Sequence, residues 1–179
     1  MKKNYLFILL VGVSLFVKAQ KLQLDTNQSS IKYKAKHLAH AWDGVNQKLQ
    51  GLAVVGEGMI KQIAIKAAVR DFDSNNANRD SHALEVLEAL QFPEVRFYSK
   101  QIRQEDESTL LIDGVLSFHG IEIPKRVTAK YKATSDAFVL EGNFDFQATD
   151  FEVKLPSFML VKINDRIKIE YAISFRSNE

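Results

Sequence analysis

Alternation of apolar and polar side chains runs through most of this chain and constrains its fold more than any other feature. In residues 29–36, for example, Ile31, Tyr33 and Ala35 alternate with three lysines. A period of two residues places alternate side chains on opposite faces of a strand, so that one face is apolar and the other is wet. Such alternation argues against a parallel sheet buried on both faces. The chain is therefore predicted to be all-β and antiparallel.

About eight segments carry this strand pattern, and short turns join most of them. They cover residues 29–36, 49–55, 59–69, 95–102, 110–118, 125–131, 138–146 and 167–175. Residues 37–45 break the alternation and are expected to form a loop or a short helical turn. Eight antiparallel strands can close into a barrel, which removes exposed edges and can hold one small ligand. Alternation alone leaves open whether the apolar faces fill the barrel or line a cavity.

One segment, residues 78–97, departs from the strand pattern. Its apolar residues recur at the spacing of one helix face, at Ala83, Val86, Leu87 and Leu90. Asp80 or Ser81 is expected to cap the start of this helix, and Pro93 is expected to end it. A lone helix within a run of strands is predicted to lie on the barrel as a plug or a lid.

The first nineteen residues have the pattern of a secretory signal peptide. Lys2 and Lys3 form a positive region, residues 5–17 form a short apolar region, and residues 17–19 end in Ala19 at an expected cleavage site. The apolar run is too short for a comfortable transmembrane helix, and no later stretch is apolar enough to span a membrane. We therefore expect a periplasmic or secreted protein whose mature chain, residues 20–179, is a single domain.

Charge and cysteine content exclude several classes of function. Loss of Lys2, Lys3 and Lys18 lowers Lys+Arg from 24 to 21 against 22 Asp+Glu, so the formal net charge moves from +2 to −1. This balance gives no reason to expect nucleic acid as a partner. The chain has no cysteine, which excludes thiol catalysis, thiolate metal sites, iron–sulfur clusters and a lipoprotein anchor. No cofactor is predicted.

Several short motifs follow one another in a specific order. They are Asp25 with Ser29-Ser30-Ile31, Lys36-His37-Leu38, Asn78-Arg79-Asp80-Ser81-His82, Phe92-Pro93-x-x-x-Phe97 with Ser99, Gly114-x-Leu116-x-x-His119-Gly120 with Pro124, and Asp150-Phe151. In this order the chain resembles the YceI-like family of exported polyisoprenoid-binding proteins. The resemblance implies a lipocalin-like antiparallel β-barrel of about eight strands with one helix packed at an end. It also implies an elongated apolar tunnel that holds an isoprenoid or fatty-acyl chain without covalent chemistry.

Aromatic residues at strand spacing are the candidates for the wall of such a tunnel, although most aromatics with this spacing simply fill a core. The candidates are Tyr33, Trp42, Phe97, Tyr98, Phe118, Phe144, Phe146, Phe151 and Phe158, together with Met159. Phe158 and Met159 follow Pro156 in an expected loop. Apolar residues in a loop are unusual unless they are covered or used, so these two are candidates for the mouth.

Polar residues near the motifs are candidates for contacts with a ligand's head group or for structural roles. They are His37, Arg79, Asp80, His82 and His119. A guanidinium group such as that of Arg79 suits phosphate, but the preferred interpretation is that Arg79 and Asp80 form a structural pair that anchors the loop before the helix. His82 and His119 are expected to make structural hydrogen bonds.

Two other functions stay open beside lipid binding. A metal-dependent enzyme would bring together His37, His40, His82 and His119, but no recognised metal-binding spacing supports a metal site. An interaction module without a ligand would have a filled barrel and an exposed apolar patch. The chain has neither a Gly-x-Ser-x-Gly motif nor a glycine-rich phosphate loop. We therefore favour non-catalytic binding, carriage or storage of an isoprenoid, quinone or fatty-acyl chain, and we allow for a homodimer.

Overall fold

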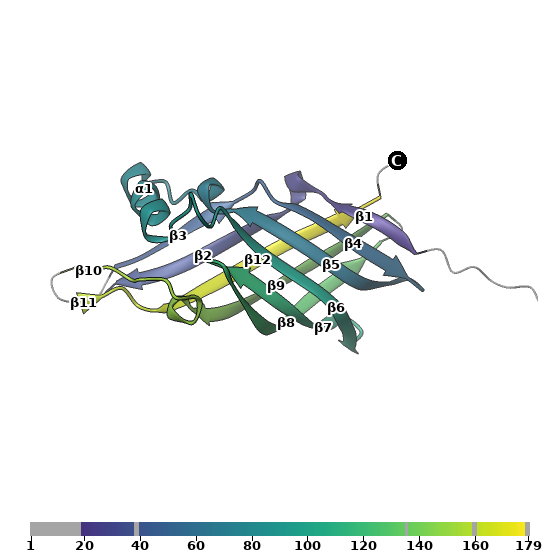
Figure 1. Cartoon of the computed structure of the whole chain (residues 1–179). Coiled ribbons are helices and arrows are strands. Elements are labelled where there is room, and N and C mark those ends of the chain that lie inside the picture. Colours follow the sequence, from purple (N-terminus) through teal and green to yellow (C-terminus); the bar gives the residue numbers. More distant parts are fainter. Residues whose placement is uncertain (1–18, 38–39, 135, 159–160, 178–179) are drawn as a thin grey trace, which may run out of the picture.

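The computed structural model describes residues 19–37, 40–134, 136–158 and 161–177, so Met159 and nearly all of the predicted signal peptide lie outside it. Eight strands form a closed antiparallel barrel with one α-helix, which confirms the predicted fold class (Figure 1). The strand at residues 20–24, which completes the barrel, was not predicted, and the predicted strand at residues 29–36 lies outside these eight. In their order around the barrel, these strands are β1 (Gln20–Leu24), β4 (Gln50–Gly56), β5 (Met59–Ala68), β6 (Glu94–Asp106), β7 (Thr109–Phe118), β8 (Ile121–Ala133), β9 (Ala137–Gln147) and β12 (Arg166–Arg176).

The barrel closes where the first strand meets the last. Leu24 on β1 pairs with Phe175 on β12. Asp25, directly after β1, donates its backbone N–H to the Ser174 carbonyl at 2.8 Å, and its carboxylate lies 3.2 Å from Arg176 Nε. One acidic residue therefore reinforces the seam through both its backbone and its side chain.

Two further strands extend the barrel wall. After the short helix η1 (Thr26–Gln28), β2 (Ser30–His37) continues along the first half of β12, and β3 (His40–Asn46) returns beside β2. The prediction that residues 37–45 form a loop is therefore wrong. The alternation was hidden because two of the buried positions on β3 are Gly44 and Asn46 rather than large apolar residues. Asn46 is fully buried and donates its side-chain amide to the Ala68 carbonyl at 3.0 Å.

The segment after β5 carries the chain from the barrel to its helix. It passes through the short helix η2 (Val69–Asp71) and then follows the edge of β3, where Val45 and Asp73 exchange backbone hydrogen bonds of 2.9 and 3.0 Å. The helix α1 (Ala77–Val86) then covers one end of the barrel beside β3 (Figure 1). The helix thus lies on the barrel end, as expected of a plug or lid.

Both ends of α1 differ from the prediction. Asn76, not Asp80 or Ser81, caps the start, and its side chain accepts the Arg79 N–H at 3.0 Å. The helix ends at Val86, well before Pro93, because Glu88 takes a left-handed backbone conformation with φ of 46°. Leu90 consequently leaves the apolar face and is fully exposed. The ends of the helix are therefore set by an asparagine cap and a left-handed turn rather than by the spacing of apolar residues.

The barrel interior holds two clusters of buried side chains. The larger includes Leu22 on β1 and Phe175 on β12, the two strands that meet at the seam, and Ile60 on β5. The smaller contains Leu116, Phe118, Ala148, Phe151 and Val153, against which the helix residues Val86 and Leu87 pack.

The chain between β9 and β12 completes the end that α1 covers. It contains the short helix η3 (Ala148–Phe151) and the small hairpin of β10 (Ser157–Phe158) and β11 (Val161–Lys162), which lies at the same end of the molecule as α1 (Figure 1). In the part of the chain that the structure describes, no helix has the length and apolar character needed to cross a membrane.

Candidate functional site

A cavity of about 300 Å³ lies inside the barrel, and residues of both buried clusters line it. Its wall is mostly aliphatic and aromatic. Six of the aromatic residues predicted from the sequence lie on this wall, namely Tyr33, Trp42, Phe97, Phe118, Phe144 and Phe146. The barrel is therefore not filled by its own side chains. An interaction module without a ligand was expected to have a filled barrel, so the cavity argues against that alternative.

The remaining apolar candidates lie elsewhere. Phe151 is 1% exposed and packs behind the wall, with its ring 5.5 Å from Phe118 and 5.4 Å from Phe146. Tyr98 is 41% exposed and does not line the cavity. Phe158 lies in β10 rather than in a loop, and its side chain, like Met159, is outside the described part of the chain. Strand parity separates inward from outward positions, but it does not separate a cavity wall from the packing behind it.

The sequence analysis missed a large part of the wall because it selected aromatic residues. Part of the aliphatic lining comes from α1 and the residue after it, from β12 and from the chain on either side of the β10–β11 hairpin, at Ala83, Leu84, Val86, Leu87, Leu155, Ile163, Ile167, Ile169 and Ile173. Tyr171 on β12 also lines the cavity and donates its hydroxyl to the Thr128 carbonyl at 3.2 Å. Burial raises the pKa of Tyr171 to about 12. The alternation of β12 was the signal that could have found these strand positions.

Glycines on neighbouring strands lie beneath three of the aromatic rings. The pairs are Tyr33 over Gly44, Phe97 over Gly114, and Tyr171 over Gly142, and in each a Cβ atom on the glycine would overlap the ring. Because the glycines carry no side chain, the rings rest directly against the wall and the centre of the barrel stays open. A glycine inside a strand often marks such a close approach, and this signal was present in the sequence.

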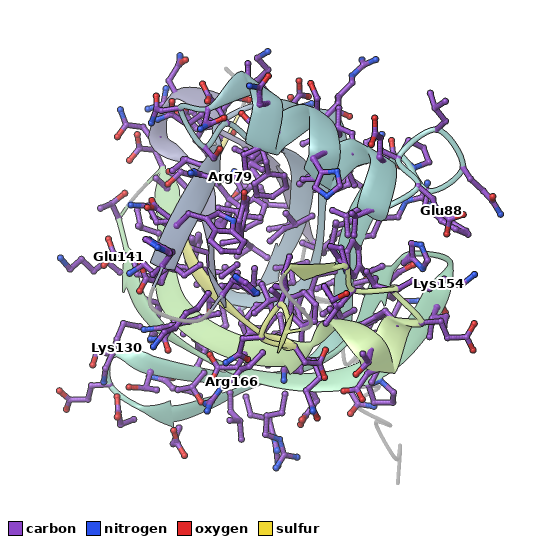
Figure 2. The ribbon with its side chains drawn as sticks, turned by 90° about the vertical axis from the view of Figure 1, so that its left-hand side faces the viewer. Arg79, Glu88, Lys130, Glu141, Lys154 and Arg166 are labelled. Carbon is purple, nitrogen blue, oxygen red and sulfur yellow. The ribbon has the colours of Figure 1, made fainter. Side chains whose placement is uncertain are left out.

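The polar part of the lining gathers near α1. Figure 2, which looks into the α1 end, shows Arg79 beneath the helix on the barrel side, whereas Glu88, Lys130, Glu141, Lys154 and Arg166 lie around the outside. Arg79 and Asp80 both line the cavity, with the Arg79 guanidinium carbon 5.8 Å from the centre of the Trp42 ring.

Arg79 and Asp80 were interpreted as a structural pair that anchors the loop before the helix, and the structure shows the anchoring contact for Asp80 but no ion pair between the two side chains. Both Asp80 carboxylate oxygens accept the Ser74 N–H at 3.2 Å, so Asp80 anchors the loop before the helix, while Arg79 packs on Trp42. Adjacent helix residues do not face each other, which is why the two side chains separate. Burial raises the pKa of the Tyr33 phenol, and the nearby Asp80 carboxylate raises it further.

The histidines lie at separate positions and contact different partners. His82 lines the cavity, and its Nδ1 lies 3.5 Å from the Glu85 carboxylate on the exposed side of α1. His119 is buried, and its ring nitrogens lie 2.9 Å from the Phe151 carbonyl oxygen and 3.1 Å from a Glu88 carboxylate oxygen. His37 ends β2 and does not line the cavity. Among the residues described, no three His, Asp or Glu side chains come together where they could hold a metal ion.

Comparison with known proteins assigns the chain to a family. The model of the YceI-like domain matches residues 22–175. The chain belongs to the YceI-like family. A curated relative, the UPF0312 protein of Pseudomonas fluorescens strain SBW25, is 27% identical over 150 residues, which cover 75% of this chain and 73% of the relative. The resemblance stated from the motifs is thereby confirmed.

Solved structures share the fold of this YceI-like chain. BcnA of Burkholderia cenocepacia superposes with a TM-score of 0.76 at 14% identity, covering 84% of this chain and 98% of BcnA. A polyisoprenoid-binding domain from Saccharophagus degradans, implicated in plant cell wall breakdown, has a TM-score of 0.72 at 9% identity, covering 88% and 98%. The YceI protein of Campylobacter jejuni has a TM-score of 0.69 at 14% identity, covering 100% of both chains. At these identities the likeness concerns the fold.

Proposed function

We propose that this YceI-like protein binds a long apolar chain non-covalently inside its barrel and carries or stores it. The observation that carries the proposal is the apolar cavity of about 300 Å³ at the α1 end. Membership of the YceI-like family and the fold shared with a polyisoprenoid-binding domain support it. An isoprenoid, a quinone tail and a fatty-acyl chain all satisfy the apolar wall, so the wall selects for an apolar chain rather than for one lipid.

The size of the cavity sets how much of a chain it can bury. At ~30 Å³ for a group the size of a water molecule or a methylene, it has room for roughly ten such groups. Each buried CH₂ contributes about 0.8 kcal/mol, which corresponds to roughly a fourfold gain in affinity per methylene. Beyond roughly ten groups, a chain must extend through the mouth or widen the barrel, so each added methylene should contribute less.

A homologous series of n-alkyl alcohols tests this proposal by calorimetric titration of residues 20–179. We expect affinity to rise by roughly fourfold per CH₂ and then level off near the length that fills the cavity. Ala67→Leu, which adds volume to the lining, should weaken binding of the longest chains. Ala64→Leu is the matched control, because Ala64 lies on the same strand but is exposed and does not line the cavity. Absence of binding across the whole series would refute the proposal.

Native mass spectrometry of protein purified without detergent complements the titration, because it retains whatever the cell supplies. A stoichiometric isoprenoid, quinone or acyl adduct is expected. An apo mass that stays unchanged after incubation with long-chain lipids would contradict chain binding. The same spectra report the oligomeric state, and so test the homodimer that the sequence left open.

We further propose that the protein is exported to the periplasm or beyond and is cleaved near Ala19. The proposal rests on the charged and apolar pattern of residues 1–19. It is supported by the start of β1 at Gln20, because cleavage after Ala19 would leave every strand of the barrel in the mature chain. N-terminal sequencing of protein recovered from a periplasmic fraction is expected to begin near Gln20.

A further inference from the structure

A depression on the outer wall of the barrel gathers positive charge. It has a volume of about 460 Å³ and lies where β2 pairs with β12 and β12 pairs with β9. Four of the side chains that line it are cations and one is a carboxylate, namely Lys34, Lys36, Arg166, Lys168 and Asp145. Figure 2 shows Arg166 on the outside of the barrel. These five residues are called the outer basic patch below.

The pairing of β2 with β12 brings these cations together. Lys34 pairs with Lys168, and Asn164, just before β12, donates its backbone N–H to the Lys36 carbonyl at 2.9 Å. Alternate residues of a strand face opposite sides, so Lys34 and Lys36 face outward while Ala35 between them lines the cavity. Ala35 also lines the outer depression. A single strand therefore separates the outer basic patch from the cavity.

Two lysines of the outer basic patch share one carboxylate. Glu170 Oε1 lies 2.7 Å from Lys34 Nζ and 3.2 Å from Lys168 Nζ. Lys36 is exposed and makes no ion pair with any residue that the structure describes. Because exposed ion pairs contribute little to stability, an incoming anion can engage all three ammonium groups.

The outer basic patch is positive on a chain that is slightly negative. Asp145 is engaged by Arg166, whose Nε lies 2.9 Å from a carboxylate oxygen. With Asp145 and Glu170 counted against its four cations, the patch has a formal charge of +2. Residues 20–179 carry −1 in total, so the rest of them carry −3. This asymmetry would orient the molecule with the patch toward a negatively charged surface.

The position of the outer basic patch indicates which negatively charged surface suits it. β2 ends and β12 begins at the end of the barrel that α1 and the β10–β11 hairpin occupy (Figure 1). The patch therefore lies beside the end at which a chain would enter the cavity. A lipid bilayer matches both features, because its anionic head groups complement the cations and its interior holds apolar chains.

We propose that the outer basic patch docks the protein on the surface of a bilayer that contains anionic lipids. The choice of a bilayer rests on the proposed function, because an apolar chain is drawn from a membrane and returned to one. The docking contact itself does not require an occupied cavity. Each Lys or Arg near an anionic surface strengthens binding by roughly fivefold, so an excess of two charges gives roughly 25-fold.

Vesicle sedimentation of residues 20–179 tests this docking. One set of vesicles contains phosphatidylcholine alone, and the other contains phosphatidylcholine with about one third phosphatidylglycerol, which is anionic. At low salt we expect the protein to bind the anionic vesicles roughly 25-fold more tightly than the neutral ones. Added salt should reduce this difference, because exposed charges are screened.

A double variant, Lys36→Gln with Lys168→Gln, should weaken binding to the anionic vesicles by roughly 25-fold. The matched control is Lys132→Gln with Lys61→Gln, which removes the same charge from the opposite end of the barrel. Lys132, like Lys36, is exposed without an ion pair among the described residues, and Lys61, like Lys168, has one carboxylate partner. The control should bind nearly as the natural protein does. Urea denaturation of both variants verifies that they are folded.

Four outcomes would overturn the proposal. Equal binding to the two kinds of vesicle would exclude anionic lipid as the partner, and binding that added salt leaves unchanged would exclude electrostatic docking. Equal losses in the two double variants would show that net charge, rather than the outer basic patch, governs binding. Binding of soluble polyglutamate without binding of anionic vesicles would replace the bilayer with an acidic protein as the partner.

Titration with the n-alkyl alcohols separates this inference from the proposed function. Both double variants should bind the alcohols as the natural protein does, because none of the four substituted lysines lines the cavity. Alcohol binding without vesicle docking would overturn the inference and leave chain binding intact. Vesicle docking without alcohol binding would refute the proposed function, while the outer basic patch would stand as a membrane-binding surface.

Discussion

Gly44 lies beneath the Tyr33 ring at a point where β3 pairs directly with β2. Tyr171 and Gly142 are paired in the same way on β12 and β9, whereas Phe97 lies over Gly114 diagonally, because Gly114 pairs with Ser99. At the scale of single residues, the open centre of the barrel thus depends on the smallest side chains as well as on the aromatic wall. Without these glycines the rings would have to swing into the space that a ligand needs.

Gly44→Ala tests this dependence because the three atoms nearest to its new methyl group would all belong to the Tyr33 side chain. We expect a loss of about 1–3 kcal/mol in the free energy of unfolding, measured by urea denaturation, because overpacking forces side chains off their preferred rotamers. In a Tyr33→Leu background the same substitution should cost much less. Gly56→Ala is the control, since its methyl group would lie 3.6 Å from the nearest Lys61 carbon. Equal losses at Gly44 and Gly56 would show that the ring contact is unimportant.

At the scale of elements, alternation predicted most of the barrel and failed where the inward positions of a strand are not large apolar residues. The strands that became β5, β7, β9 and β12 were predicted nearly in full, because their inward positions are consistently apolar. β3 was missed, since Gly44 and Asn46 occupy inward positions on it. The start of α1 was placed late, because the Asn76 cap lies outside the apolar repeat. The barrel seam between β1 and β12 could not be predicted, because it joins residues at opposite ends of the chain.

The candidate site was predictable to a similar degree and for similar reasons. Strand parity found most of the aromatic wall, and the family motif found Arg79 and Asp80. Parity could not separate Phe151, which lies behind the wall, from the rings that line it. Nor could the motif show that the two side chains separate, with Asp80 on the loop and Arg79 on Trp42, because side-chain partners depend on the packing of α1.

The turn after α1 is fastened to the barrel by His119, at the β7–β8 connection. Its Nδ1 faces the Phe151 carbonyl, its Nε2 faces the Glu88 carboxylate, and its ring lies 4.4 Å from that of Phe92. Both polar partners are acceptors, so both contacts are hydrogen bonds at once only when the imidazole carries two N–H groups. One buried side chain thus connects the end of α1, the β7–β8 turn and η3.

His119→Asn tests this connection, because asparagine tolerates the left-handed backbone at this position (φ 48°) but is too short to reach both partners. We expect a loss of about 1–3 kcal/mol in the free energy of unfolding, the usual cost of leaving a buried polar group without its partner. Amides of residues 87–92 should exchange with solvent faster than those of β12. Glu88→Gln keeps the bond to Phe151 and should have a smaller effect. Unchanged exchange in residues 87–92 would contradict the role of His119 as an anchor.

At the scale of the whole molecule, ion pairs on the outer wall link neighbouring strands. Three carboxylates each lie between two cations: Asp113 between Arg126 and Arg103, Glu94 between Lys66 and Arg96, and Glu170 between Lys34 and Lys168. Hydrogen bonds from Arg126, Lys66 and Lys34, respectively, lower the pKa of these carboxyl groups below their ordinary values. Because all three are partly exposed to solvent, salt should weaken their contribution.

The lowered pKa values of these carboxyl groups determine whether the free energy of unfolding rises or falls with pH. A carboxyl group whose pKa is lower in the folded than in the unfolded chain stabilises the fold above its ordinary pKa of about 4, and this stability is lost as the pH falls through the folded value. We therefore expect the urea midpoint at low salt to fall as the pH is lowered from about 5 to about 3. A variant with Glu94→Gln, Asp113→Asn and Glu170→Gln should be less stable at pH 7 and lose less on acidification. Glu141→Gln is the control, because Glu141 is exposed and has no ion pair within the described residues. If the triple variant loses as much stability on acidification as the natural protein, the three cross-strand carboxylates do not govern its acid stability.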